Sequence, residues 1–424
     1  MSEFVRVAMV APCAFPANHG TPAAIKELSE ALAKRGHRIE VVTYPVFDEG
    51  IPFEKVAVHR GPTIGAHRRR LGVGPSWQRL GYDAGLVPTL VRIIHATGAQ
   101  LIHAHNFEGA LAAYPARLVT GRPLIYNAIN SMADELHTYN LIRPKAVVNT
   151  LAKALDRWVP RMADHVIADT RQLYDFVLSQ GVSAERVNVV PSGVNVAMFT
   201  GLDGRECRRR LGLEGKRVVI YTGTFDLFQG VNRLIAAFSK VASNCPESIL
   251  LLVGGTVARQ DTELCRQTAK ELGIESRVVI TSCSLSDVPS YLAAADVAVV
   301  PRVSPTAGGI PTKLLNYMAA GKAIVCHRSS AAFLVHRQSA WFAGPDPTEF
   351  AQGMICLLND DALAAYMGAN VRRLAETTFS WSEIAQEVET VYRRVLGRRG
   401  VARPEGSGNA FSSADGHATN QGLS

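Results

Sequence analysis

The residues best suited to chemistry lie in one stretch, PRVSPTAGGIPTKLLNYMAAGKAIV, at positions 301–325. An apolar run of strand length ends at Arg302, a loop of small residues follows, and the next segment has a helical period with Lys313 in its first turn. A helix N-terminus and glycine amides bind phosphate, and two cations strengthen that attraction. The stretch therefore predicts a phosphate site built from Arg302, Lys313 and the amides of Gly308 and Gly309. The alternative is that Arg302 and Lys313 merely point into solvent.

Two further loops have glycines where a strand gives way to a helix. In AFPANHGTPA, at 14–23, Gly20 would let the backbone approach a ligand before the helix begins. In YTGTFDLFQGV, at 221–231, Thr224 follows the strand and Gln229 precedes the helix. In the second loop the glycines can equally well serve only to make the turn. The same alternative applies to Gly20, so the sequence leaves ligand contact at the first loop open.

The elements that must position these loops follow a regular order. Short runs rich in Val and Ile alternate with segments of helical period, beginning with strand 5–12, helix 21–36 and strand 38–44. The same order restarts at 217 with strand 217–225 and helix 231–243. This alternation predicts an α/β fold with two Rossmann-like doubly wound domains, and ligands of such sheets collect where the strands end.

Length and composition support two large domains. The chain has 424 residues, 47% of them hydrophobic and 19% charged, which excludes a mostly disordered protein. The domains expected are a Rossmann-like domain at 1–195, a second one at 196–378, a C-terminal helix at 379–398 that packs back on the first domain, and a disordered tail at 399–424.

Cysteine usage and hydropathy indicate a compartment. The seven cysteines form no C-x-x-C pair and no zinc spacing, which argues against a disulfide framework and a structural metal. The apolar runs are too short for a signal peptide or a transmembrane helix. We expect a cytoplasmic protein, with possible peripheral contact at the inner face of the cell membrane.

A net charge of +8 leaves three classes of partner: nucleic acid, anionic lipid or a phosphorylated substrate. Residues 60–82 contain five arginines and no acid, with Leu71, Val73 and Trp77 interleaved. This segment could lie on anionic lipid, or be a solvated loop. Nucleic acid is the least favoured partner because no recognition motif accompanies the charge.

The order of these pieces resembles the glycosyltransferase family 4 enzymes, which have the GT-B fold with two facing domains and a cleft. MADHVIADTRQLYDFVLSQGVSAERVNVVPSGVNVAMF, at 162–199, resembles the family's interdomain segment, and GGIPTKLLNYMAAGKAIV resembles its donor-binding block. The resemblance implies transfer of a sugar from a nucleotide-diphosphate donor to a hydroxyl or amine, with retention and without a metal or other cofactor. It also implies that 1–195 is the acceptor domain and 196–378 the nucleotide-sugar donor domain. The acceptor would be a lipid-linked glycan, a polysaccharide or a small molecule.

Several positions depart from the family pattern. Its paired glutamates align with Gly308 and Asn316, and its basic pair aligns with Thr224 and Gln229. Asn316 could still bind a ribose hydroxyl, and Arg302 and Lys313 could replace the lost cations. The donor-binding residues expected are Gly20, Thr224, Gln229, Arg302, Gly308, Gly309, Ile310, Lys313 and Asn316.

On the acceptor side, the histidine usual in the family aligns near Ile129 and Asn130. His105 and Glu108 follow another strand end and are, with Asn130, the candidate catalytic residues. The alternative is that His105 is a hydrogen-bonded loop histidine and that Glu108 starts a helix.

Two other functions remain open. The lost carboxylates would also fit a protein that binds nucleotide sugars, or supports a partner transferase, without turnover. A nucleotide-sugar epimerase has the same fold. An oxidoreductase is disfavoured because no glycine loop has the G-x-G-x-x-G spacing.

Overall fold

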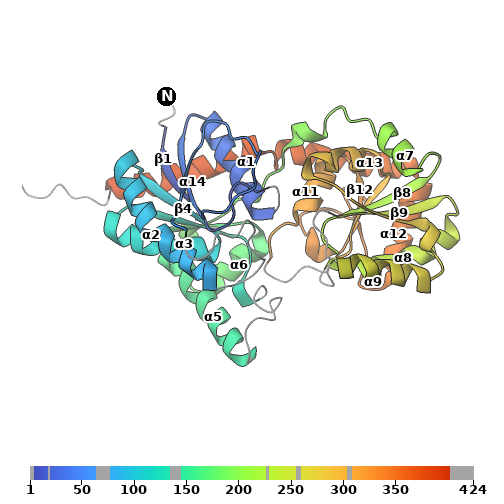
Figure 1. Ribbon diagram of the computed structural model, residues 1–424, viewed down its shortest axis with the longest axis horizontal. Coiled ribbons are helices and arrows are strands. Elements are labelled where there is room, and N and C mark those ends of the chain that lie inside the picture. The colour runs from blue at the N-terminus through green and yellow to red at the C-terminus, as the bar shows by residue number, and fades with distance from the viewer. Residues whose placement is uncertain are drawn as a thin grey trace, which may run out of the picture.

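The computed structural model describes residues 4–17, 20–63, 77–133, 145–225, 229–254, 259–302 and 308–401 (Figure 1). Within these residues the first domain has a seven-stranded sheet with the order β3-β2-β1-β4-β5-β6-β7, and every pairing is parallel. The strands are β1 (Arg6–Ala11), β2 (Arg38–Thr43), β3 (Ala57–Arg60), β4 (Leu101–His105), β5 (Leu124–Ala128), β6 (His165–Ala168) and β7 (Val187–Val189).

Helices cover both faces of this sheet, so its central strands are apolar on both sides, as parallel sheets require. The apolar residues of α2, α3, α5 and α6 pack on one face, and those of α1 and α14 pack on the other. The helices are α1 (Gly20–Lys34), α2 (Trp77–Thr97), α3 (Asn106–Thr120), α5 (Lys145–Met162), α6 (Arg171–Ser179) and α14 (Trp381–Val401).

The second domain repeats the plan. Its described strands form a six-stranded parallel sheet with the order β10-β9-β8-β11-β12-β13. They are β8 (Arg217–Thr222), β9 (Ser248–Gly254), β10 (Val278–Ser282), β11 (Val297–Val300), β12 (Ala323–Cys326) and β13 (Trp341–Phe342).

Its helices also divide between the two faces, with α10, α11 and α13 on one and α8, α9 and α12 on the other. They are α7 (Arg205–Leu211), α8 (Val231–Asn244), α9 (Arg259–Glu271), α10 (Val288–Ala293), α11 (Thr312–Ala319), α12 (Pro347–Asn359) and α13 (Asp361–Thr377). The strand order reverses between β1 and β4 and between β8 and β11, which are the switch points of a doubly wound sheet. The predicted fold class is confirmed.

The chain crosses between the domains twice, and the two crossings lie side by side. The Val194 amide donates to the Phe379 carbonyl at 2.7 Å, and Val194 forms a bridge with Ser380. Helix α14 then returns to the first domain, where the Tyr392 hydroxyl lies 2.7 Å from Nδ1 of His103 (Figure 1). The helix ends at Val401, beyond the predicted end at 398, and residues 402–424 of the expected tail lie outside the described residues.

Among the helices that the structure describes, none combines the length and hydropathy that a membrane span requires.

Candidate active site between the two domains

Lys313 forms the centre of a polar cluster in the second domain. Its Nζ donates to the Tyr221 hydroxyl at 2.6 Å and to Oε1 of Gln229 at 2.9 Å. The Tyr221 hydroxyl in turn donates to the Thr224 carbonyl at 2.7 Å. Three residues predicted for donor binding, Thr224, Gln229 and Lys313, are therefore in one place, although they come from the end of β8, the start of α8 and the first turn of α11.

Gly223 makes this arrangement possible. Its φ of +131° disfavours any side chain, and a Cβ there would lie 2.8 Å from Nζ of Lys313. The glycine thus lets the ammonium group approach the backbone that follows β8. This cation and the end of the strand form the part of the second domain best suited to an anionic ligand.

The loop before α11 contacts the first domain directly. The Gly309 amide donates to Oδ1 of Asn130 at 3.2 Å, and the Ile310 amide donates to Oδ2 of Asp169 at 2.9 Å. The Thr170 hydroxyl donates to the Gly308 carbonyl at 3.2 Å. We call these three hydrogen bonds the interdomain latch. Asn130 follows β5, and Asp169 and Thr170 follow β6, so the latch lies where these strands end.

Asp169 also connects the latch to the interdomain segment. Its Oδ1 accepts from the amide and hydroxyl of Ser192, at 2.6 and 2.8 Å. The side chain is buried, and burial raises the pKa of its carboxyl even though the hydrogen bonds from Ile310 and Ser192 oppose the shift. The sequence suggested no role for this residue, and its position directly after the strand HVIA was the only signal that could have found it.

The latch changes the interpretation of the glycine loop. The amides of Gly309 and Ile310 were expected to meet the donor, but here they bind oxygens of the first domain. A donor can use these amides only after the latch bonds open. Asn130, expected near the acceptor, lies against the donor loop itself.

The remaining donor candidates are placed around this cluster. Asn316 is half-buried on α11, in the turn that follows Lys313. Arg302 is half-buried after β11, and its carbonyl accepts from the Ser330 hydroxyl at 2.7 Å. Gly20 begins α1 with open space around its Cα. Residues 226–228 and 303–307, between several of these positions, lie outside the described residues.

His105 is buried rather than open to an acceptor, being only 3% exposed. Its ring stacks on His103 with 4.5 Å between centroids, and burial holds its pKa well below the ordinary value. It lines a cavity of about 30 Å³ together with Asn127 and Asp169. This environment keeps the imidazole neutral and favours a structural role over general base catalysis.

Glu108 is half-buried in the first turn of α3, whereas His105 is buried. Asn106, just before it, has a φ of +58°, an uncommon backbone conformation outside glycine. Burial raises the pKa of the Cys13 thiol to about 12, and the charges of Arg79 and Glu108 lower and raise it respectively. Glu108 and Arg79 therefore lie near the end of β1.

Arg79 also lies at this edge of the sheet, and the sequence presented it only as part of the basic segment 60–82. Its charge also lowers the pKa of Asp83, which burial raises. Asp83 accepts a hydrogen bond of 2.5 Å from the Tyr44 hydroxyl, just after β2. A carboxylate, a phenol and a guanidinium thus gather where β1, β2 and β4 end, which is the edge expected to hold an acceptor.

The rest of the basic segment is only partly described. Residues 64–76, with Arg68, Arg69 and Arg70, lie outside the described residues. The Arg60 guanidinium lies 4.1 Å from the centroid of the Phe47 ring. Trp77 and Leu80 at the start of α2 are 89% and 57% exposed.

No group of three or more His, Cys, Asp or Glu side chains in the described part of the chain could hold a metal ion.

Comparisons with known proteins agree with this architecture. The family model described as "Glycosyl transferase 4-like domain" matches residues 19–193, and the model described as "Glycosyl transferases group 1" matches residues 216–360. The D-inositol 3-phosphate glycosyltransferase of Xylanimonas cellulosilytica is 25% identical over 88% of this chain and 91% of its own length. The N-acetyl-alpha-D-glucosaminyl L-malate synthase of Bacillus anthracis is 23% identical over 90% and 96%.

Solved structures give the same fold. Sucrose-phosphate synthase from Thermosynechococcus elongatus superposes with a TM-score of 0.73 at 21% identity, over 93% of this chain and 100% of that one. Anabaena HepE in complex with UDP superposes with a TM-score of 0.70 at 19% identity, over 92% and 100%. The two family models fall on the two domains in order, and the chain belongs to the GT-B glycosyltransferases of the family 4 and group 1 type.

Proposed function

We propose that this glycosyltransferase takes a sugar from a nucleotide-diphosphate donor bound mainly by the second domain. The observation that carries the proposal is the Lys313 cluster, which places an ammonium group beside Gln229 and the end of β8. The cluster lies on the same helix N-terminus as the loop that contacts the first domain. A leaving diphosphate gains most from a fixed cation and aligned amide dipoles at this position.

The acceptor hydroxyl or amine binds to the first domain, at the edge that holds Arg79, Glu108 and the Tyr44–Asp83 pair. An acidic acceptor would suit the Arg79 charge. The names of two relatives are consistent with this, because they specify a 3-phosphate and a malate as part of the acceptor or product. The acceptor is a lipid-linked glycan, a polysaccharide or a small molecule, and the assay below distinguishes lipid-linked from soluble acceptors.

Retention of the anomeric configuration and independence from divalent metal complete the proposal. Both follow from the family resemblance. Lys313 and Arg302 supply the positive charge that a metal would otherwise bring to the departing diphosphate. The solved relative HepE has been obtained with UDP and with UDP-glucose, so uridine nucleotides are the first donors to test.

The test is a panel of UDP-, GDP- and dTDP-sugars, each assayed for binding by calorimetry and for product by mass spectrometry with lipid-linked and soluble acceptors. Lys313→Met should weaken binding of the selected donor at least tenfold, because a charge-assisted contact contributes about 1.5–3 kcal/mol. Lys240→Met is the matched control, since Lys240 is exposed on α8 and bonds only to Thr348 among the described residues. Equal donor affinity in the two variants would refute the assignment of Lys313.

The same assay separates the two other functions. Donor binding without a product, across all acceptors, would support a noncatalytic nucleotide-sugar-binding protein, which the occupied amides of the latch would suit. Conversion of the donor sugar to its epimer, without transfer, would identify an epimerase.

We further propose that the enzyme acts at the inner face of the cell membrane, with the segment at 60–82 touching anionic lipid. Trp77 and Leu80 support this, because both are exposed where α2 begins. The double variant Trp77→Ser, Leu80→Ser should lose most of its sedimentation with vesicles containing phosphatidylglycerol. The control is the pair Leu264→Ser, Leu272→Ser, which removes exposed apolar side chains from the second domain. Equal sedimentation of both pairs would refute this contact.

A further inference from the structure

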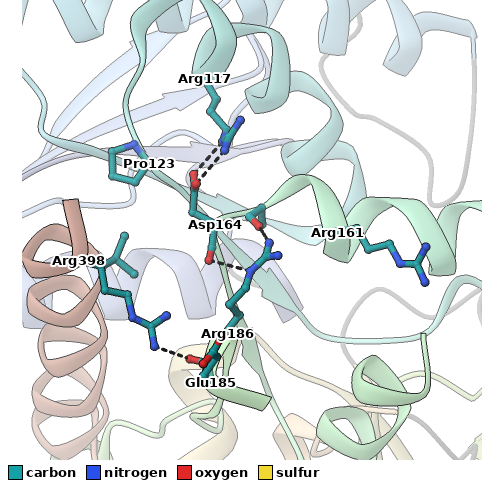
Figure 2. Close-up of a pocket in the computed structure, with 9 residues that line it drawn as sticks. Arg117, Pro123, Arg161, Asp164, Glu185, Arg186 and Arg398 are labelled. Atoms are coloured by element: carbon teal, nitrogen blue, oxygen red, sulfur yellow. Dashed lines mark hydrogen bonds and ion pairs between the residues drawn. The ribbon is translucent and has the colours of Figure 1, made fainter. Parts of the chain in front are cut away.

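A second pocket lies in the first domain, at the edge opposite the candidate active site (Figure 2). Its walls include Pro123, Asp164 and Arg186, which directly precede β5, β6 and β7. The latch residues Asn130 and Asp169 follow β5 and β6, so the sheet separates the two sites. The volume of the pocket is about 550 Å³, which is within the range of small-molecule sites.

The lining of this pocket is positively charged. Arg117, Arg161, Arg186 and Arg398 lie around it, with Asp164 and Glu185 as the acids (Figure 2). Arg117 takes up the charge of Asp164, because it donates to both carboxylate oxygens, at 2.7 and 2.8 Å. The other three arginines face one remaining carboxylate, so the pocket has an excess of positive charge.

Those three guanidinium groups are held by backbone carbonyls rather than by acids. Nε of Arg161 donates to the Gln180 carbonyl at 2.9 Å, and Nη2 of Arg398 donates to the Glu185 carbonyl at 3.1 Å. Arg186 donates to the carbonyls of Asp164 and Ala163. A carbonyl has only a partial charge, so these contacts fix each guanidinium without neutralising it. Fixed cations lose little conformational entropy when an anion binds.

The arginines of the pocket also act on His165, which lies next to the pocket wall. Burial, together with the charges of Arg394, Arg398 and Arg186, lowers the pKa of His165 to about 4, and the hydrogen bond that its ring gives to Oδ1 of Asn188 opposes the shift. His165 is the first residue of β6, directly after Asp164 in the pocket wall. Arg186 and Arg398 therefore act on a residue next to the pocket wall as well as on the pocket itself.

We propose that this pocket binds a phosphate-bearing anion, at a site separate from the donor and acceptor sites. A guanidinium binds two phosphate oxygens at once, and several arginines lining one pocket favour a phosphate or diphosphate over a simple carboxylate. The phosphate can belong to a soluble compound or to a phospholipid headgroup. Leu118 and Val119, which follow Arg117 on α3, are 61% and 69% exposed and provide an apolar surface for the second source.

The test is calorimetric titration of the full chain with inorganic pyrophosphate, and sedimentation with phosphatidylcholine vesicles that do or do not contain phosphatidylglycerol. Arg398→Ala and Arg161→Ala should each weaken binding roughly tenfold, the loss expected for one charge-assisted contact. Arg205→Ala is the control, because Arg205 is 89% exposed at the start of α7 and pairs only with Asp203 among the described residues. Arg398 is exposed in the last turns of α14, so its truncation leaves the core intact.

The titration is repeated in the Lys313→Met background, which should weaken pyrophosphate binding at the proposed donor site at least tenfold and leave binding at this pocket unchanged. Pyrophosphate binding that survives Lys313→Met and is weakened by Arg398→Ala identifies a soluble phosphate ligand. If Arg398→Ala weakens vesicle binding but pyrophosphate does not bind, the ligand is a phospholipid headgroup. If neither pyrophosphate binding nor vesicle binding responds to Arg398→Ala or Arg161→Ala, the proposal of a phosphate site is overturned. That result would not affect the proposed function, which is tested by the separate measurement of donor binding.

Discussion

Replacing Gly309 by alanine tests the latch that joins the two domains. A Cβ at this position would lie 2.6 Å from Oδ2 of Asp169 and 3.1 Å from the Ile129 carbonyl. The φ of Gly309 is outside the left-handed region, so alanine can adopt the backbone conformation and only the close contact opposes it. Asp169 cannot move away easily, because Ser192 holds its other oxygen with two hydrogen bonds. We therefore expect the loop and the first domain to separate.

The size of the effect follows from the bonds that are lost. The Ile310 amide gives a charge-assisted hydrogen bond to Asp169 and the Gly309 amide a neutral one to Asn130, at 2.9 and 3.2 Å. Together they contribute about 3 kcal/mol to the closed arrangement. Their loss shifts the balance between closed and open arrangements roughly a hundredfold towards the open one.

Hydrogen exchange followed by mass spectrometry measures this shift at the amides of Gly309 and Ile310, and small-angle scattering measures the separation of the domains. Gly309→Ala should speed exchange of these two amides strongly and increase the radius of gyration. Gly397→Ala is the matched control, because a Cβ there would meet no atom within 4 Å.

The double variant Asp169→Ala, Gly309→Ala sharpens the test, because removing the carboxylate also removes the contact with the new methyl group. The two substitutions should therefore be clearly non-additive in their effect on amide exchange. Unchanged exchange in Gly309→Ala, or strict additivity in the double variant, would refute the reasoning.

Three further predictions concern stability and the donor cluster. Burial lowers the pKa of His103 from 6.5 to about 4, so the folded state keeps this ring neutral while the unfolded state protonates it. The free energy of unfolding should therefore fall as the pH drops from 6.5 to 4, by roughly 3 kcal/mol from this group. Denaturant titrations should show a smaller fall in His103→Gln, and an equal fall would contradict the assignment. Glu389 is buried on α14 and pairs with Arg35 at 2.6 Å, so Glu389→Gln should lower the free energy of unfolding by about 3 kcal/mol. The exposed Glu383→Gln serves as control, and equal stability of the two variants would argue against the pair. Tyr221→Phe removes a hydrogen bond that positions Lys313 and should weaken donor binding a few-fold, with a loss of about 1 kcal/mol in the free energy of unfolding. Unaltered donor affinity would contradict this positioning role of Tyr221.

The alternation of Val-rich strands and amphipathic helices made the fold predictable, because each local pattern agrees with the same parallel sheet. Strand SILLLVG is buried throughout and RVVIYT is buried after its first residue, and an apolar run of this length between turns has few other solutions. The positions of the three glycine-bearing loops followed from the same rule, since every loop after a parallel strand lies at one edge of its sheet.

Which side chains meet at that edge was decided by the tertiary structure alone. Lys313 and Gln229 are distant in sequence and meet because β8 and β11 are neighbours in the sheet. His105 looked reactive by type and position, but α14 returns from the far end of the chain and lines the small cavity that His105 faces. Burial, and not residue type, then sets its protonation.

The interdomain latch shows most clearly which contacts cannot be predicted from the sequence. Asp169 and Ile310 belong to different domains, and no periodicity within either domain fixes the orientation of one relative to the other. The sequence by itself determined two doubly wound sheets and the loops at their edges, because local hydrophobic patterns encode strands and helices. Only the docking of the domains decided that Asp169 binds the donor loop, because that contact depends on distances between residues that no local pattern relates.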